Sequence, residues 1–125
     1  FSMKNALIQQ AKPYYNHFMI AAIEDETLEK TMMAQVSQAL LLIKGCVASF
    51  TIARVKNNPN AVAVSARSDG SYNVQKIMEK LNGGGHFSAA AVERADVSVQ
   101  QMKDMILKCI EEEQNTESNI ASRYS

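Results

Sequence analysis

The sequence of 125 residues contains no tryptophan, only two cysteines and two prolines, and no excess of charge of either sign. A formal net charge of zero argues against a protein whose main work is coating long nucleic acid, because that binding depends on basic residues. A local site for a small anionic ligand is compatible with this balance. No stretch approaches the ~20 apolar residues of a membrane-spanning helix, and nothing resembles a signal peptide. We therefore expect a soluble, cytoplasmic globular domain.

Residues that bind metals or form disulfides are also scarce. Cys46 and Cys109 form no Cys-x-x-Cys pair and have no histidine at metal-ligand spacing. Both fall in apolar patterns, which predicts free, buried thiols in a reducing compartment. His17, one of the two histidines, is expected to pack beside neighbouring tyrosines. The acidic run at 24–26 is expected to begin a helix rather than to bind metal.

Hydrophobic periodicity predicts strands and helices that alternate along the chain. The expected strands are 18–23, 47–55, 61–68 and 89–95, and the expected helices are 4–11, 28–44, 73–81 and 98–110. Asn73 is a natural N-cap, and Ser98 with Gln101 fits a capping box. The order is β-α-β-β-α-β-α after an N-terminal helix, which predicts an α/β fold with a mixed β-sheet and packed helices.

The two ends of the chain are expected to differ from its middle. The opening Phe1-Ser2-Met3 has no initiator methionine at its start, so we expect residues 1–17 to be a cloning scar and a linker helix from a larger parent. Residues 18–113 are expected to form the folded domain. Residues 114–125 are polar and are expected to be a disordered tail.

The most distinctive stretch is Gly83-Gly84-Gly85-His86, which follows the helix at 73–81 and precedes a run of small residues. One glycine can end a helix, but three in a row predict a bare loop whose N–H groups form a nest for an anion. His86 adds an imidazole that can donate a hydrogen bond to phosphate. The alternative is a flexible turn with a solvent-facing histidine, because a short glycine motif alone is weak evidence.

Arg67 is a second candidate, at the end of the strand at 61–68. Alternation along that strand places Ala63, Ser65 and Arg67 on one face. An arginine that ends a face of small residues can clamp an anion through two parallel hydrogen bonds. The alternative for this residue alone is a surface salt bridge. The small side chains at 89–95 indicate that another group packs or approaches closely there.

Several stretches together resemble a known family, the DHH-associated C-terminal subdomain of DHH-family phosphoesterases. They are Val64-Ser65-Ala66-Arg67-Ser68, Asn73-Val74-Gln75, Ile77-Met78-Glu79, Gly83-Gly84-Gly85-His86 and Ala89-Ala90-Ala91. These motifs most resemble those of the membrane-anchored cyclic-di-AMP phosphodiesterases of the GdpP type. The resemblance is densest from about Ile43 to Val97. One departure is Asn82, where close relatives often carry a further glycine; asparagine tolerates the left-handed conformation better than most residues.

The resemblance implies a substrate-binding subdomain that faces a separate DHH subdomain across a cleft. The DHH subdomain holds a pair of metal ions, usually manganese, and activates the hydrolytic water, so this chain alone is expected to be inactive, with no catalytic residue or metal ligand. The residues implied for substrate or phosphate binding are Gly83, Gly84, Gly85, His86, Arg67 and Ser65. The implied partners are a cyclic dinucleotide or short oligonucleotide and the parent's DHH subdomain. Although the parent can be anchored in the cell membrane, we expect no direct membrane contact by this chain.

Two other functions stay open at this point. Related subdomains occur in single-strand exonucleases, oligoribonucleases and alanyl-tRNA synthetases, so one is a general nucleic-acid-binding module. Tyr72 and Phe87 are the few aromatic residues near the motif, whereas single-strand binders use stacking platforms and a basic groove. The other is a purely structural subdomain whose glycine loop docks on its neighbour.

Overall fold

The computed structural model describes the backbone of residues 2–124 and the side chains of residues 2–117. The helices are α1 (Met3–Gln9), α2 (Lys30–Leu40), α3 (Val74–Lys80) and α4 (Val99–Tyr124), and the strands are β1 (Lys12–Tyr14), β2 (Phe18–Leu28), β3 (Ala48–Val55), β4 (Asn58–Ser68), β5 (Gly84–His86) and β6 (Ala89–Arg94). The strands form one sheet in the order β1-β2-β3-β4-β6-β5. Of the five pairs of neighbouring strands in this order, β2 and β3 run parallel and the other four pairs run antiparallel. The predicted α/β fold with a mixed sheet is confirmed, with β1 and β5 as two short additional edge strands.

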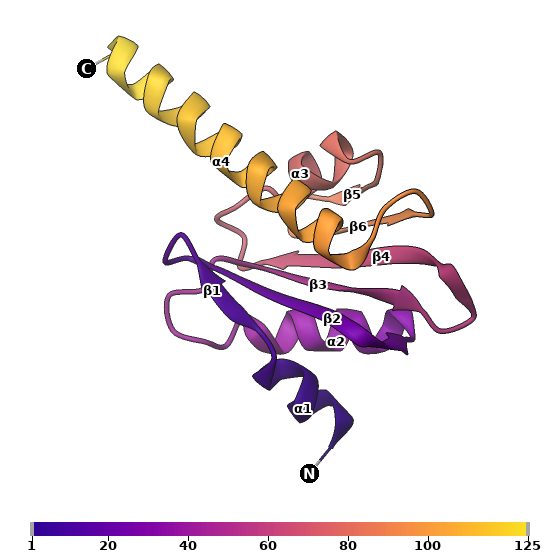
Figure 1. Ribbon diagram of the computed structural model, residues 1–125. Helices are drawn as coiled ribbons and strands as arrows, with labels where there is room; N and C mark the ends of the chain where they lie inside the picture. Colours follow the sequence, from indigo (N-terminus) through magenta and orange to yellow (C-terminus); the bar gives the residue numbers. More distant parts are fainter. Residues whose placement is uncertain (1, 125) are drawn as a thin grey trace.

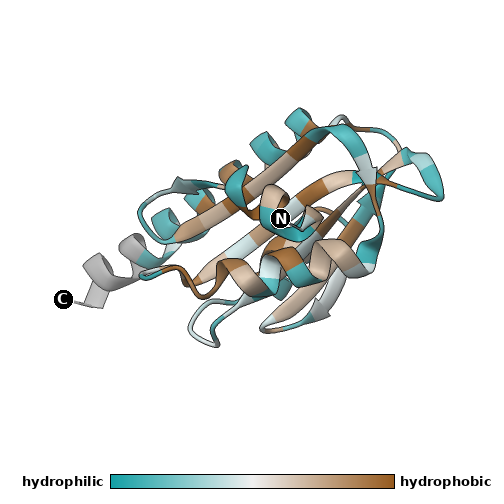
Figure 2. Cartoon of the chain, turned by 90° about the horizontal axis from the view of Figure 1, so that it is seen from below, coloured by the Kyte–Doolittle hydropathy of each residue, from teal (hydrophilic) through white to brown (hydrophobic). Residues whose placement is uncertain are grey.

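Helices cover both faces of the sheet (Figure 1). Below it lie α2 and α1, and above it lie α3 and the long α4. Alternate residues of β3 supply the two cores: Phe50 and Ile52 pack toward α3 and α4, whereas Ala53 and Val55 pack toward α2. In Figure 2 the apolar residues follow the central strands and the faces of the helices turned toward them. The sheet is therefore the middle of three layers.

A chain of buried hydroxyl groups fixes α2 on the sheet. Ser37 donates a hydrogen bond of 2.7 Å to the carbonyl of Ser65, and its Oγ lies 2.7 Å from Oγ1 of Thr51. Ser49 in turn donates to the carbonyl of Ser37 at 2.5 Å. Because buried polar groups without partners are costly, these mutual bonds let α2 sit directly against β3 and β4.

The predicted helix starts are confirmed where side chains cap them. The side chain of Asn73 accepts from the backbone N–H of Lys76 at 3.2 Å. Before α4, Ser98 Oγ accepts from the amide of Gln101 at 3.0 Å, and the side chain of Gln101 accepts from the amide of Ser98 at 2.8 Å. This reciprocal pair is a capping box.

The first acidic run does not begin a helix. Residues 24–26 belong to β2, and α2 begins only at Lys30. The pairing of β2 with β3 shifts between Ile23 and Thr27, so the three acidic residues form an exposed irregularity before Leu28 returns to the core. Pairing of β2 with β3 before and after this segment keeps it extended, which overrides the local preference of acidic residues for a helix start.

The ends of two helices differ from expectation, those of α2 and α4. Helix α2 ends at Leu40 rather than near Lys44, and the chain reaches β3 through a turn at Gly45, which has φ +87°. The expected linker helix forms as α1, and its Leu7 is buried in the core beneath α2. The expected tail from residue 114 is helical as far as Tyr124, because α4 continues past the sheet (Figure 1).

Candidate functional site

The glycine motif begins as the C-terminal cap of α3. Asn82 adopts the left-handed conformation with φ 72°, as expected for a tolerant residue. Its amide donates to the carbonyl of Glu79 at 3.1 Å, and the amide of Gly83 donates to the carbonyl of Met78 at 2.8 Å. These two bonds form a Schellman motif. The amide of Gly83 is therefore occupied, and the expectation that all three glycine amides are free for an anion does not hold for this residue.

The rest of the motif is a strand rather than a bare loop. Gly84–His86 form β5, which pairs antiparallel with β6 through a two-residue turn at Phe87 and Ser88. Glycine has little intrinsic preference for strands, so the pairing with β6 supplies the order. Since β5 is the outermost strand, alternate backbone groups along it face away from the sheet. The groups that remain for a ligand therefore lie along a strand edge.

The three glycines have different reasons to be glycine. A Cβ on Gly83 would lie 2.6 Å from Cβ of Val92, which is a steric clash. A Cβ on Gly85 would lie 2.6 Å from the carbonyl oxygen of Ala89, and the residue has φ +144°, a conformation that favours glycine. Gly84 has neither constraint: its φ is not positive, and no atom of the described residues lies within 4 Å of a Cβ there. Only Gly84 thus faces open space that the fold does not need.

That open space belongs to a groove of about 500 Å³ between α2 and the outer strands. Helix α2 contacts β2, β3 and β4, so the same face of β6 and β5 is left uncovered. The lining residues are Lys30, Met33, Ala34, Ala63, Val64, Ser65, Arg67, Gly83, Gly84, Gly85, Ala89, Ala90, Ala91, Val92 and Glu93. The volume is within the range of small-molecule sites, and the walls are apolar with a few polar groups, as such sites usually are.

The register of the sheet brings the predicted residues into rows across this groove. Arg67 lies opposite Ala89, which lies opposite His86 on its other side. In the next row Ser65 lies opposite Ala91, which lies opposite Gly84. Residues paired directly across strands share a face of the sheet, so both rows face the side of α2. Two strand spacings of about 4.8 Å put the backbones of Arg67 and His86 roughly 10 Å apart.

Arg67 is held by the backbone and not by a carboxylate. Its Nη1 donates to the carbonyl of Ala66 at 2.9 Å. Among the side chains of residues 2–117 no carboxylate forms an ion pair with it, so the salt-bridge alternative is not what these residues form. Most guanidinium donors are thus left for an anion, which an arginine can bind in a bidentate manner.

Ser65 and His86 contribute differently. Ser65 is buried at the floor of the groove, and its carbonyl is fixed by the hydroxyl of Ser37 at 2.7 Å. His86 is exposed on the edge strand, where its imidazole is free to approach a ligand from outside the sheet. Ser65 thus belongs to the floor of the groove, whereas His86 is not among the residues that line it.

Sequence reasoning missed the wall that α2 supplies. Lys30, Met33 and Ala34 line the groove, and Lys30 forms an ion pair with Glu93 of β6. The side chain of Met33 is buried, and no local signal in the sequence shows that it also borders a groove. By contrast, the small residues of β6 were expected to accept a close neighbour, and Ala89 to Ala91 do line the groove.

Arg94, at the end of β6, was also missed and ties that strand to α3. Its guanidinium donates to Asp96 at 2.6 and 2.9 Å and to the carbonyl of Leu81 at 3.4 Å. The hydrogen bonds from this guanidinium hold the pKa of Asp96 below its usual value. The loop before the glycines is thus fixed from two sides.

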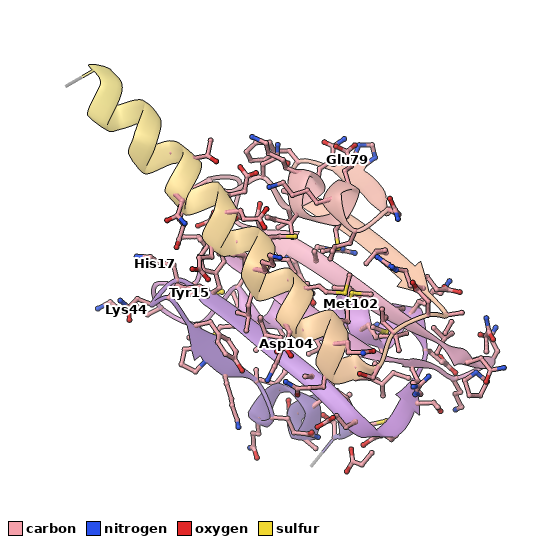
Figure 3. The ribbon with its side chains drawn as sticks, turned by 45° about the horizontal axis from the view of Figure 1, so that its top comes forward. Tyr15, His17, Lys44, Glu79, Met102 and Asp104 are labelled. Carbon is pink, nitrogen blue, oxygen red and sulfur yellow. The ribbon has the colours of Figure 1, made fainter. Side chains whose placement is uncertain are left out.

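The other titratable residues singled out in the sequence lie away from the groove. His17 lies near Tyr15 and Lys44, away from Glu79 of α3 (Figure 3), and its Nδ1 is 3.4 Å from the carbonyl of Gly45. Cys46 and Cys109 are free and buried, as predicted, and burial raises the pKa of both thiols.

The residues described do not suit a two-metal centre. Over residues 2–117, no three side chains of histidine, cysteine, aspartate or glutamate come together as metal ligands. Two-metal centres need several such ligands around ions about 4 Å apart. No helix in the described part is both long and apolar enough to cross a membrane.

Comparisons with known proteins agree with this fold. The model of the DHHA1 domain matches residues 16–115. The chain is 35% identical over 112 residues to the cyclic-di-AMP phosphodiesterase PdeA of Listeria monocytogenes, and these cover 89% of this chain and 17% of that protein. It is 37% identical over 109 residues to the cyclic-di-AMP phosphodiesterase GdpP of Bacillus subtilis, covering 85% and 16%. The chain thus spans about a sixth of the length of these relatives.

Solved structures with low sequence identity share the architecture. An exopolyphosphatase-related protein of Bacteroides fragilis superposes with a TM-score of 0.67 at 16% identity, over 90% of this chain and 35% of that one. The pGpG-specific phosphodiesterase PggH of Vibrio cholerae gives a TM-score of 0.58 at 18% identity, over 85% and 37%. At this identity the likeness concerns the fold alone. The family match over most of the chain and the identity to its relatives show that this chain belongs to the DHHA1 domain family.

Proposed function

We propose that this chain is the nucleotide-recognition subdomain of a cyclic-di-AMP phosphodiesterase and that the groove between α2 and β5–β6 binds the dinucleotide. The chain spans only about a sixth of these relatives, and we propose that hydrolysis takes place in a separate DHH subdomain with a pair of metal ions, manganese by our proposal. The free, buried cysteines support a reducing cytoplasmic location for this subdomain.

The observation that carries the proposal is the open space above Gly84. Two of the three glycines are explained by contacts within the chain, and Gly84 is not. A glycine that the fold does not require is expected where another backbone or a ligand approaches closely. Gly84 lies in one row across the sheet with Ser65 and Ala91, so a ligand that approaches Gly84 meets a floor of small residues.

The groups around this floor suit a phosphodiester anion. Arg67 offers guanidinium donors that no carboxylate of residues 2–117 occupies, and His86 stands across β6 from it on the same face. Both can donate hydrogen bonds to phosphate oxygens, and their rigid strands hold the donors in place before the ligand arrives. Their role is to position the substrate and to stabilise its charge.

The proposal is tested by calorimetric titration of the chain with cyclic-di-AMP, linear diadenylate and a short single-stranded oligonucleotide. Replacement Arg67→Gln is expected to weaken dinucleotide binding about 10- to 100-fold, because hydrogen bonds to charged groups contribute roughly 1.5–3 kcal/mol. His86→Ala is expected to weaken it less, since its side chain is exposed. The control is Arg54→Gln, another arginine bound to a carbonyl, at 3.1 Å, but outside the groove.

Three results would point elsewhere. Equal losses of dinucleotide affinity in Arg67→Gln and Arg54→Gln would mean that Arg67 acts only through the net charge of the protein. Binding of the oligonucleotide alone, with steep salt dependence, would favour the general nucleic-acid-binding module. No binding of any ligand by a folded sample would remove recognition from this chain and favour a structural role.

A further inference from the structure

The end of the groove away from Arg67 carries an ion pair to which nothing above gives a role. Lys30, in the first turn of α2, pairs with Glu93 near the end of β6, and both residues line the groove. The side chains are 63% and 35% exposed. Because so exposed a pair contributes little to folding stability, a ligand can exchange its own groups for this contact at small cost.

The register of the sheet gives the separation between this pair and the proposed phosphate site. Glu93 lies opposite Ala63, and it is four residues along β6 from Ala89, which lies opposite Arg67. Four residues of a strand span about 13 Å. Between the two ends the floor consists of small residues, so nothing on it blocks a flat ring. With a phosphate at Arg67, the groove has room for the attached nucleoside to lie along it with the base toward Lys30 and Glu93.

We propose that Lys30 and Glu93 read the edge of the bound base and select adenine over guanine. This inference rests on the proposed function of the same groove. The ammonium of Lys30 can only donate hydrogen bonds, and the carboxylate of Glu93 can only accept them. On the edge that carries N7, adenine presents that acceptor beside its amino donor, whereas guanine presents two acceptors, N7 and O6.

The pair therefore matches adenine and opposes guanine. Lys30 donates to N7 while Glu93 accepts from the exocyclic amino group, and the two contacts replace the ion pair of the free protein. With guanine in the same position, O6 faces the carboxylate of Glu93, and two acceptors meet without a proton between them. Such a repulsive contact is an efficient source of specificity.

A purely structural pair behaves differently when its charges are exchanged. If Lys30 and Glu93 only join α2 to β6, the double variant K30E/E93K keeps an ion pair and leaves relative affinities for two ligands unchanged. If they read the base, the exchange places a carboxylate opposite N7 and an ammonium opposite the amino group. The ratio of affinities for adenine and guanine dinucleotides then changes, and this ratio is insensitive to a uniform loss of fold.

The test is calorimetric titration of the full chain with cyclic-di-AMP and cyclic-di-GMP. The wild type is expected to bind the adenine ligand roughly tenfold or more tightly, and both Glu93→Gln and K30E/E93K are expected to remove most of that preference. The matched control is the exchange K56E/E29K, which reverses an exposed ion pair of 3.8 Å outside the groove and should leave the preference intact. Arg67→Gln should weaken both ligands alike, because the phosphate is common to them.

The outcomes separate this inference from the function on which it rests. An unchanged preference in Glu93→Gln and K30E/E93K, with both ligands still dependent on Arg67, overturns base reading and leaves the nucleotide-binding function standing. A wild type that binds neither dinucleotide overturns both. A wild type that binds both equally, with dependence on Arg67, overturns the selection of adenine alone.

Discussion

Gly83 and Gly84 are neighbours in sequence, but alanine at the two positions should have opposite consequences. At Gly83 an added methyl group falls 2.6 Å from Cβ of Val92 and meets the backbone of β6 as well. At Gly84 it meets no atom within 4 Å in the part of the chain that the structure describes. Gly83→Ala is thus expected to damage the fold, and Gly84→Ala to leave it intact while filling the space proposed for a ligand.

The expected changes in stability follow from side-chain packing at Gly83 and from the entropy of the unfolded chain at Gly84. Forcing a methyl group into a packed site costs typically 1–3 kcal/mol, and more where backbone must move, as it must between Gly83 and β6. Gly84→Ala restricts the unfolded chain and is expected to change stability by roughly +0.4 to +1 kcal/mol in the favourable direction. For a domain of this size each kcal/mol shifts Tm by about 3–6 °C, so the two variants should melt well apart.

Thermal and urea unfolding measure the stability of each variant, and calorimetric titration with cyclic-di-AMP measures its binding. The reasoning predicts a stable Gly84→Ala that binds at least several-fold more weakly than the wild type, and a destabilised Gly83→Ala. It is refuted if the two variants lose equal stability, because the open space at Gly84 is then not real. It is also refuted if Gly84→Ala and the larger Gly84→Val both bind as well as the wild type.

Three further predictions concern stability. Tyr72→Phe should leave stability unchanged or raise it by up to about 1 kcal/mol in thermal unfolding, because the buried hydroxyl has no hydrogen-bond partner among residues 2–117 and burial raises its pKa. A clear loss of stability would mean that a water or another group satisfies the hydroxyl. Ser98→Ala should cost about 1 kcal/mol through loss of the cap on α4, and Ser98→Asp should restore most of it. The ion pair with Lys80 at 2.7 Å lowers the pKa of Glu113, so its contribution is present above the ordinary value of 4.5 and is lost as pH falls through the lowered folded value. Glu113→Gln should therefore flatten the fall in unfolding free energy as pH drops below 4.5, and the same fall in the variant and the wild type would contradict this assignment.

Much of the fold follows from local signals in the sequence. The alternation at 61–68 correctly separates the two faces of β4, and Asn73 and Ser98 begin the helices that they were expected to begin. The acidic run at 24–26 misleads, because β2 pairs with β3 on both sides of it, at Ile23 and from Thr27 onward, and this holds the segment extended. The end of α2 is likewise decided by the route of the chain into the sheet.

The site is predicted less completely than the fold. Arg67, Ser65 and the glycines can be singled out from sequence because small residues and a lone arginine are unusual on a strand face. That residues 84–86 form a strand depends on β6, and three glycines carry no preference that would show it. Lys30 and Glu93 carry no signal at all, since the groove arises where α2 stops covering the sheet, a property of the whole arrangement.

The most direct test of the account is to locate bound ligand on the chain. Backbone amide signals would be followed by NMR during a titration with cyclic-di-AMP. The account predicts that the signals that move most belong to residues 63–67, 83–86 and 89–93, with little change in the part of α4 that packs on the opposite face. Shifts centred on α4, or on the loop of His17 and Gly45, would contradict the assignment of the groove as the nucleotide site.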